Sequence, residues 1–477
     1  MSKFIKKILN FQKRKNGNIS ILVLVMSLAI ILLTTAMVGY IFHDIGFTEL
    51  DKGELRALHF AESGLSYMYY KIEQYSKGLI PDLPVDPDTP WPPVDVGDPD
   101  NPEGRFTVKY HTDDKGGLEF YTITSTGIDI SSGATRTVRV NTLSFDIFDF
   151  IYSGEAMGAE KIKGQTNITG PLFVNGDFGL VIGNSSFLEG PLFVKGDITI
   201  SGSSSIGKYE NPIILFLGGN INGSPFDPES PPDNVYVSEY YNTVVDVTLP
   251  TIDKSYIDLV KKSDPGTPDI DGNLFIGKIK EKNVERNVIM KSIGMIQWEE
   301  VNYPGYLEFN NYGILKISGS IVVNGDIYIG EPPKGLKNVL STPYTIEYSG
   351  NGNLISTGDI TVGSQVIPEN NLAGFPSSDL MALISLENIY LNLTNAIGDK
   401  HDDDPTNPKI AAMLIANKKI ETSENTFLRG GSVSNSLVLG QNTQVYYEEG
   451  IGKALATGIP GFSGKIFVLN WQEIIAD

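Results

Sequence analysis

The feature that most limits the folds open to this chain is an octet, Gly-Pro-Leu-Phe-Val-x-Gly-Asp, which stands at 170–177 and again at 190–197. Drifted copies of its strand and glycine corner follow at 317–330 and 354–363. A period near twenty residues, with one short apolar strand and a glycine corner per repeat, is typical of a parallel β-solenoid. A β-sandwich with long hairpins is the alternative, but it does not explain the two near-identical octets. We therefore expect Phe173 and Phe193 to form a ladder inside a stack of coils.

Composition agrees with a mainly β chain of more than one domain. The 477 residues include 50 glycines, 27 prolines, 22 tyrosines and 22 phenylalanines, which favour strands and turns over helix bundles. We expect the solenoid to occupy residues 146–477, with an insertion at about 225–300 that contains a helix near Thr251–Lys262. The formal net charge of −20 would repel phosphates, so nucleic acid is not an expected partner.

The N-terminal part contains an uncharged apolar run at 19–42. As a helix, these residues would be ~36 Å long, enough to cross the ~30 Å hydrocarbon core of a bilayer. The preceding leader, 1–18, has six basic residues and no acid, so the positive-inside rule places it in the cytoplasm. A secretory signal peptide is the alternative, but the run is too long and lacks a small-residue cleavage motif. The sequence thus predicts a single-pass transmembrane helix with the C-terminal body outside the cell.

Three segments connect the predicted span to the solenoid. Residues 43–78 retain helix-forming residues and one apolar face, which predicts that the helix continues beyond the membrane. Residues 79–104 are rich in proline and acids and are expected to form a linker. Residues 105–145 alternate between apolar and polar side chains around turn formers, which indicates a small antiparallel sheet. The apolar side chains of this sheet, such as Phe106, are expected to cover the helix.

The order of these features resembles a known family. A basic leader ending in Lys15-Asn-Gly17, an uncharged helix, the motif Ala61-Glu-Ser-Gly-Leu65 and a meander ending in Thr-Arg-Thr-Val-Arg-Val are similar to the PilX-type N-terminal region of type IV pilus assembly proteins. The resemblance covers roughly residues 1–145. The remainder is similar to the glycine-rich solenoids behind such N-termini in bacterial surface proteins.

The resemblance implies a minor pilin or pseudopilin, and it assigns roles to a few residues. Gly17 and Asn18 would flank the cut of a prepilin peptidase. On the predicted helix, Glu62 is a candidate contact to a neighbouring subunit or to the small sheet, and a solvated helix carboxylate is the alternative. Leu22 stands fifth after the cut, where major pilins carry a glutamate that neutralises the neighbour's terminal amine. The implied partners are other pilins, inner-membrane pilus assembly proteins, membrane lipid and the peptidase. A subunit without the glutamate and with a large outer body is expected at the filament tip.

The enzyme alternative rests on aspartates at the repeat corners: Asp177, Asp197, Asp326 and Asp359. In solenoid polysaccharide lyases, aligned aspartates hold calcium, so an anchored carbohydrate-active enzyme is the second hypothesis. Turn formation explains the same residues without chemistry. The chain has no cysteine and only four histidines, and the run from His401 to Asp404 fits an exposed loop as well as a metal site. We expect a noncatalytic protein without cofactor or metal, displayed for assembly, adhesion or ligand capture.

Overall fold

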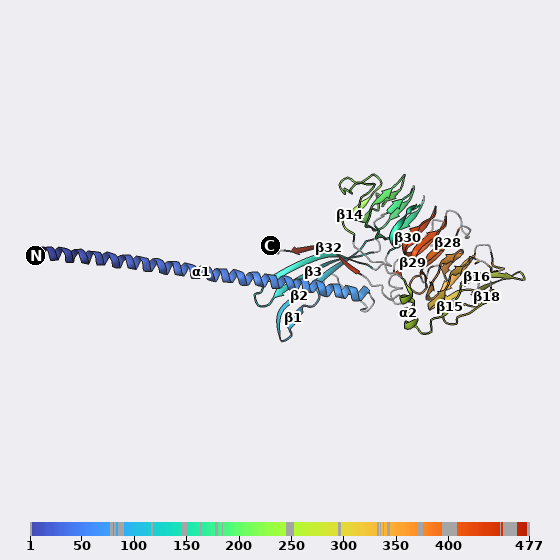
Figure 1. Ribbon diagram of the computed structural model, residues 1–477, viewed down its shortest axis with the longest axis horizontal. Coiled ribbons are helices and arrows are strands. Elements are labelled where there is room, and N and C mark those ends of the chain that lie inside the picture. The colour runs from blue at the N-terminus through green and yellow to red at the C-terminus, as the bar shows by residue number, and fades with distance from the viewer. Residues whose placement is uncertain are drawn as a thin grey trace.

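In a computed structural model, the protein consists of a long helix, a small antiparallel sheet and a large body of stacked parallel strands (Figure 1). The structure describes residues 2–76, 80, 83, 90–115, 118–145, 150–162, 165–176, 180–183, 185–244, 252–293, 297–331, 333, 335–336, 338–340, 344–369, 372, 375–393, 408–448, 450–451 and 465–474. Side chains are described over the same ranges except 2–25, 41–47, 153, 155–161, 180–181 and 465–467. The prediction of a mainly β chain is confirmed.

Helix α1 (Ser2–Ser76) contains no proline and ends shortly before Pro81. Its 75 residues correspond to ~110 Å at ~1.5 Å per residue, and its N-terminal end extends far from the rest of the molecule (Figure 1). The C-terminal part of α1 packs on the sheet, whereas the side chains at 26–40 are exposed. No helix in the part of the chain with described side chains is long and apolar enough to cross a bilayer. The predicted span, 19–42, reaches outside that part at both ends.

The small sheet has the strand order β1-β2-β3-β4-β32, and all neighbours are antiparallel. The strands are β1 (Val94–Asp98), β2 (Asn101–Asp114), β3 (Glu119–Asp129), β4 (Thr135–Phe145) and β32 (Lys465–Ile474). As expected, Phe106, Val108 and Tyr110 pack against Leu65 and Met68 of α1. Two strands were not predicted. β1 lies within the expected linker, 79–104, and β32 returns to the sheet from the region expected to be solenoid.

The body between β4 and β32 consists mainly of short strands paired in parallel, and we call it the stacked body. Its first strands are β5 (Tyr152–Ile162), β6 (Asn167–Thr169), β7 (Leu172–Val174), β8 (Leu180–Ile182), β9 (Phe187–Glu189), β10 (Leu192–Val194), β11 (Ile198–Ile200), β12 (Ser205–Ile206), β13 (Ile213–Leu217) and β14 (Val237–Tyr241). Phe193 on β10 pairs with Phe173 on β7, so the twenty-residue repeat sets the register.

The later elements of the stacked body follow helix α2 (Lys254–Ser263). They are β15 (Asp269–Asp271), β16 (Leu274–Glu281), β17 (Val284–Ile293), β18 (Gln297–Glu300), β19 (Leu307–Phe309), β20 (Leu315–Ile317), β21 (Gly319–Asn324), β22 (Ile327–Ile329), β23 (Thr345–Ser349), β24 (Asn351–Ser356), β25 (Ile360–Val362), β26 (Gln365–Pro368), β27 (Leu380–Ser385), β28 (Asn388–Leu391), β29 (Ile410–Thr422), β30 (Phe427–Val438) and β31 (Gln444–Tyr447).

The chain enters the stacked body at its middle and builds two arms. The first arm runs outward from β5 through β7, β10 and β13 to β14. The chain then resumes at the opposite end with β15, and the second arm runs back through β21, β24, β27 and β29 to β30. There β30 pairs in parallel with β5 and joins the arms. Figure 1 shows this order, with β14 and β15 at opposite ends and β30 between them.

The region predicted to be an insertion, 225–300, covers the two ends of the stack and one outer face. At the β14 end, Phe226 of a proline-rich loop packs into the interior and lies 4.8 Å from the Tyr240 ring. At the other end, β16 pairs in parallel with β22 but antiparallel with β17, which ends the repeat. The antiparallel strands β17 and β18 thus interrupt the parallel edge on which a further layer could pair.

The stacked body has an inner and an outer apolar cluster. Leu172 and Val174 lie in the inner cluster. Phe173 and Phe193 form the expected ladder, but the expectation that they lie inside the coils is wrong, because alternate residues of a strand point to opposite faces. Both rings belong to the outer cluster, where Phe145 and Phe150 cover them. All three residues of each Leu-Phe-Val strand are therefore buried.

Candidate subunit-contact site and ligand pocket

The Ala-Glu-Ser-Gly-Leu motif lies where α1 meets the sheet. Ala61, Gly64 and Leu65 are buried, whereas Glu62 and Ser63 point away from the sheet and are exposed. The small residues allow a close approach. A Cβ on Gly64 would lie 2.2 Å from Ser125 Oγ, and a Cβ on Gly127 of β3 would lie 2.1 Å from the Ala57 carbonyl oxygen. The motif therefore has a structural role in seating the helix.

Ion pairs hold the same junction from both sides. Arg56 on α1 lies 3.2 Å from the buried Asp129 carboxylate at the end of β3, which also accepts hydrogen bonds from Ser131 and Ser132. Burial tends to raise the pKa of Asp129, but the hydrogen bonds and the Arg56 charge outweigh it and hold the pKa below its usual range. Arg136 on β4 pairs with Glu54 of α1 and lies 3.5 Å from Glu473 of β32.

Among the candidate processing and subunit-contact residues, Glu62 alone has a described side chain, and it lies on the exposed face of α1. Its carboxylate is 3.1 Å from His59 Nδ1 one turn earlier. Leu55 and Tyr70, each 55% exposed, lie on the same face of the helix. The face therefore combines apolar and polar groups that are open to another molecule. The role of Glu62 as a subunit contact stays a prediction.

The other predicted site residues lie in the part of α1 without described side chains. Gly17, Asn18 and Leu22 belong to the helix, and the structure brings none of them near Glu62, which is about 40 residues or ~60 Å away along α1. The processing site and the fifth-position residue therefore stay predictions.

The corner aspartates form hydrogen bonds between successive layers of the stack. Asp326 Oδ1 accepts a hydrogen bond from Asp359 N at 2.9 Å, and Asp359 Oδ1 accepts one from Asn388 N at 3.1 Å. Asp197 Oδ1 accepts one from Asn220 N at 2.7 Å in the first arm. These bonds satisfy backbone donors at the corners, which supports turn formation as their role. Asp177 and the run at 401–404 lie outside the described residues. Among described side chains, no group of three acidic or histidine residues is arranged around a metal position.

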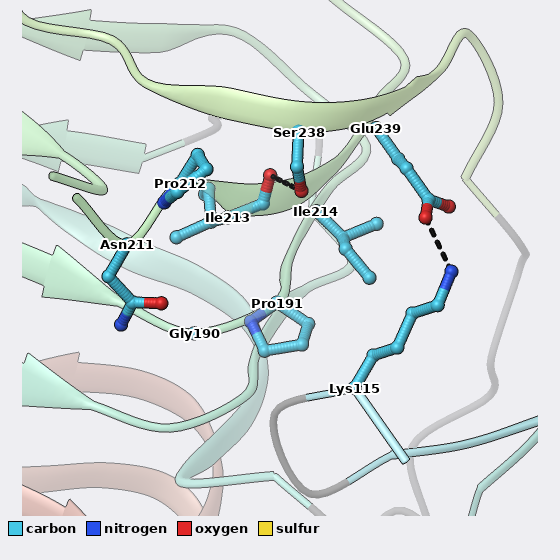
Figure 2. Close-up of a pocket in the computed structure, with 9 residues that line it drawn as sticks. All are labelled: Lys115, Gly190, Pro191, Asn211, Pro212, Ile213, Ile214, Ser238 and Glu239. Atoms are coloured by element: carbon cyan, nitrogen blue, oxygen red, sulfur yellow. Dashed lines mark hydrogen bonds and ion pairs between the residues drawn. The ribbon is translucent and has the colours of Figure 1, made fainter. Parts of the chain in front are cut away.

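A pocket of about 260 Å³ lies between the small sheet and the first arm, at a place that the sequence did not indicate (Figure 2). Its floor is apolar, and its rim carries one ammonium, one carboxylate, one amide and one hydroxyl group. The lining residues are Lys115, Gly190, Pro191, Asn211, Pro212, Ile213, Ile214, Ser238 and Glu239. They come from segments far apart in the chain, so only the register of β13 and β14 would have revealed the pocket.

A β-bulge shapes one wall of the pocket. The register of β13 with β14 shifts at Ser238, whose hydroxyl donates a hydrogen bond to the Ile213 carbonyl at 3.0 Å. The next side chain, Glu239, is thereby turned toward the sheet and forms an ion pair with Lys115 (Figure 2). Glu239 also accepts a hydrogen bond from Tyr241, and burial together with this bond raises the pKa of Tyr241 to about 12.

No protein-family model matches this chain, and no match was found among curated proteins. The resemblance to the PilX-type region therefore stays a prediction. Among solved structures, the chain is similar to the competence-associated pilin ComZ from Thermus thermophilus, with a TM-score of 0.44 and 15% sequence identity. The alignment covers 89% of this chain and 98% of that chain. Neither value is high enough to show a common function.

Proposed function

We propose that the chain is a pilin-like subunit, a minor pilin or pseudopilin, that displays its stacked body outside the cell. The observation that supports this proposal is that the two parts of α1 have different surroundings. The C-terminal part packs on an antiparallel sheet through Ala61 and Gly64, whereas the apolar side chains at 26–40 are exposed. Met26, Ile30 and Leu33 are each about 60% exposed, which is costly in water and favourable in lipid or among other apolar helices.

The uncharged run at 19–42 and the basic leader supply the rest of the topology. We infer a single pass through the cell membrane, with the N-terminus in the cytoplasm and residues after α1 outside. The partners that follow are membrane lipid, other pilins and the inner-membrane assembly proteins that would draw the subunit into a filament. A prepilin peptidase would act at Gly17–Asn18.

We infer that the stacked body is a parallel β-solenoid and that its role is noncatalytic. Oδ1 of Asp326 and Oδ1 of Asp359 each accept a hydrogen bond from a backbone N–H of the next layer, which is a structural role. This observation favours display over the alternative of an anchored polysaccharide lyase, which would need those carboxylates for calcium.

The proposed position is the filament tip, because Leu22 cannot neutralise a neighbour's terminal amine and the stacked body is bulky. The test is immunogold labelling of sheared filaments with antibody to the stacked body. The proposal predicts gold at filament ends. Labelling along the whole length would contradict the tip position, and absence of the protein from the filament fraction would contradict the pilin role.

A further inference from the structure

The rim of the pocket offers both hydrogen-bond donors and hydrogen-bond acceptors to a ligand. Lys115 has ammonium protons beyond the one used with Glu239, and the Asn211 amide makes no hydrogen bond with any described residue. The amide can therefore donate through Nδ2 and accept through Oδ1. A ligand that fits must itself both donate and accept, as a hydroxyl group does.

The floor of the pocket favours a flat apolar surface on the ligand. Ile214 belongs to the outer cluster and is 6% exposed, and Pro191 and Pro212 add two rigid rings to the lining, whereas the Ile213 side chain points to the inner cluster. A sugar ring combines the two requirements, with carbon–hydrogen bonds on its faces and hydroxyls at its edge. The volume of about 260 Å³ is just below the usual range of small-molecule sites, ~300–1,000 Å³, which suits a single sugar ring.

A tight turn next to the pocket carries the solvent-exposed aromatic ring of Tyr209. Lys208 and Asn211 exchange backbone hydrogen bonds of 3.2 and 3.0 Å, which fixes the turn that contains Tyr209. The Tyr209 side chain is 85% exposed, and its ring lies edge to face with Tyr236 at 6.4 Å. Tyr209 stands two residues before Asn211, so its Cα lies within ~7 Å of the Asn211 Cα at the pocket. An exposed, oriented ring is a suitable platform for a second sugar.

The charges of the pocket lining and of the whole chain favour a neutral saccharide over an acidic one. The pocket lining carries one positive and one negative group, which are already paired, so it has no net charge to offer an anion. The whole chain carries −20, which repels acidic polymers at long range. A neutral ligand needs no net charge in the pocket and is not repelled by the net negative charge of the chain.

We propose that this pocket, with Tyr209, binds a neutral saccharide, one unit in the pocket and the next against the tyrosine ring. The proposal rests on the proposed function in one respect, because it names the ligand class that the displayed body would capture. Binding itself does not require a filament.

The test uses the full-length protein in a detergent without a sugar headgroup. Saturation-transfer NMR is recorded with maltose, cellobiose, lactose and N,N′-diacetylchitobiose at millimolar concentration. We expect at least one disaccharide to bind. Asn211→Ala and Tyr209→Ala should each weaken its affinity by about tenfold, which corresponds to ~1.4 kcal/mol. Tyr312→Ala is the matched control, since Tyr312 is 89% exposed and lies in the second arm before β20.

Two results would overturn the proposal: binding of none of the four disaccharides, or unchanged affinity in the Asn211→Ala/Tyr209→Ala double variant. Both residues are exposed, so melting temperatures are expected to match the wild type and to show that the variants fold. The pilin role is read separately, from the amount of each variant in sheared filaments. Normal filament levels without saccharide binding would reject this site alone.

Discussion

At the scale of single residues, the contact between α1 and the sheet depends on side chains that are absent or small. Ala57 and Ala61 present backbone atoms to Gly127, so helix and strand approach more closely than larger residues would allow. The sequence predicted a helix with one apolar face over 43–78; α1 extends to Ser76, and its residues Leu65 and Met68 pack against the sheet. It did not identify Gly127 as a partner, because the two segments lie about 65 residues apart and periodicity carries no information on long-range contacts.

Substitution of Gly127 tests this close approach. A Cβ would lie 2.1 Å from the Ala57 carbonyl oxygen and 2.3 Å from Ala61 N, which are backbone atoms that cannot turn aside. We expect Gly127→Ala to lower the free energy of unfolding of the sheet by ~1–3 kcal/mol, the range typical of overpacking. Unfolding in denaturant measures this free energy. Gly39→Ala is the control, because nothing lies within 4 Å of its Cβ position. Equal stability of the two variants would mean that helix and strand are not in contact.

The buried carboxylate of Asp129 predicts a pH dependence. Its pKa is lowered in the folded protein from the ordinary value of 3.8, so the folded state favours the ionised form. The stabilisation is fully present above the unfolded pKa and is lost as the pH falls through the folded pKa. We expect the difference in melting temperature between wild type and Asp129→Asn to shrink as the pH is lowered below about 4. A difference that stays constant over the acidic range would show that the charge of Asp129 does not stabilise the fold.

At the scale of elements, repeats predict local pairing and do not predict the order of the stack. The octets at 170–177 and 190–197 correctly place β7 beside β10, because both copies survive nearly unchanged. Nothing in the repeats reveals that β5 pairs with β30, since strands Tyr152–Ile162 and Phe427–Val438 share no such motif. The pocket was missed for the same reason. It forms where Lys115 meets Glu239, and that contact exists only through the arrangement of the arms.

Phe193 tests the outer cluster, because it is 1% exposed and stacks on Phe216 with ring centroids 4.1 Å apart. Phe193→Asp would bury an unpaired charge between the sheet and the stacked body. We expect a loss of several kcal/mol or failure to fold, detected by thermal unfolding. Thr199→Asp on the neighbouring β11 is the control, since Thr199 is exposed and its substitution is expected to change stability by less than ~0.5 kcal/mol. Equal melting temperatures for the two variants would place Phe193 at the surface.

At the scale of the whole molecule, the stacked body is inserted between two neighbouring strands of the small sheet. The chain leaves the sheet after β4 and returns as β32, which pairs with β4. The body is thus attached to the sheet at two points, and Arg136 ties β4 to α1 and β32. Two chain connections restrict the movement of the stacked body relative to the sheet more than a single connection would.

The central claim, that α1 anchors a body displayed outside the cell, is tested most directly by single cysteines. The natural chain has no cysteine, so each introduced thiol reports one position. Lys3→Cys lies in the basic leader and is combined with Gly17→Phe, which blocks the proposed cut that would remove the leader. Tyr312→Cys replaces a side chain that is 89% exposed in the stacked body. Intact cells are treated with a membrane-impermeant maleimide. We expect labelling of Tyr312→Cys in intact cells and of Lys3→Cys only after permeabilisation. Labelling of Lys3→Cys in intact cells, or of Tyr312→Cys only after permeabilisation, would show that the proposed topology is wrong.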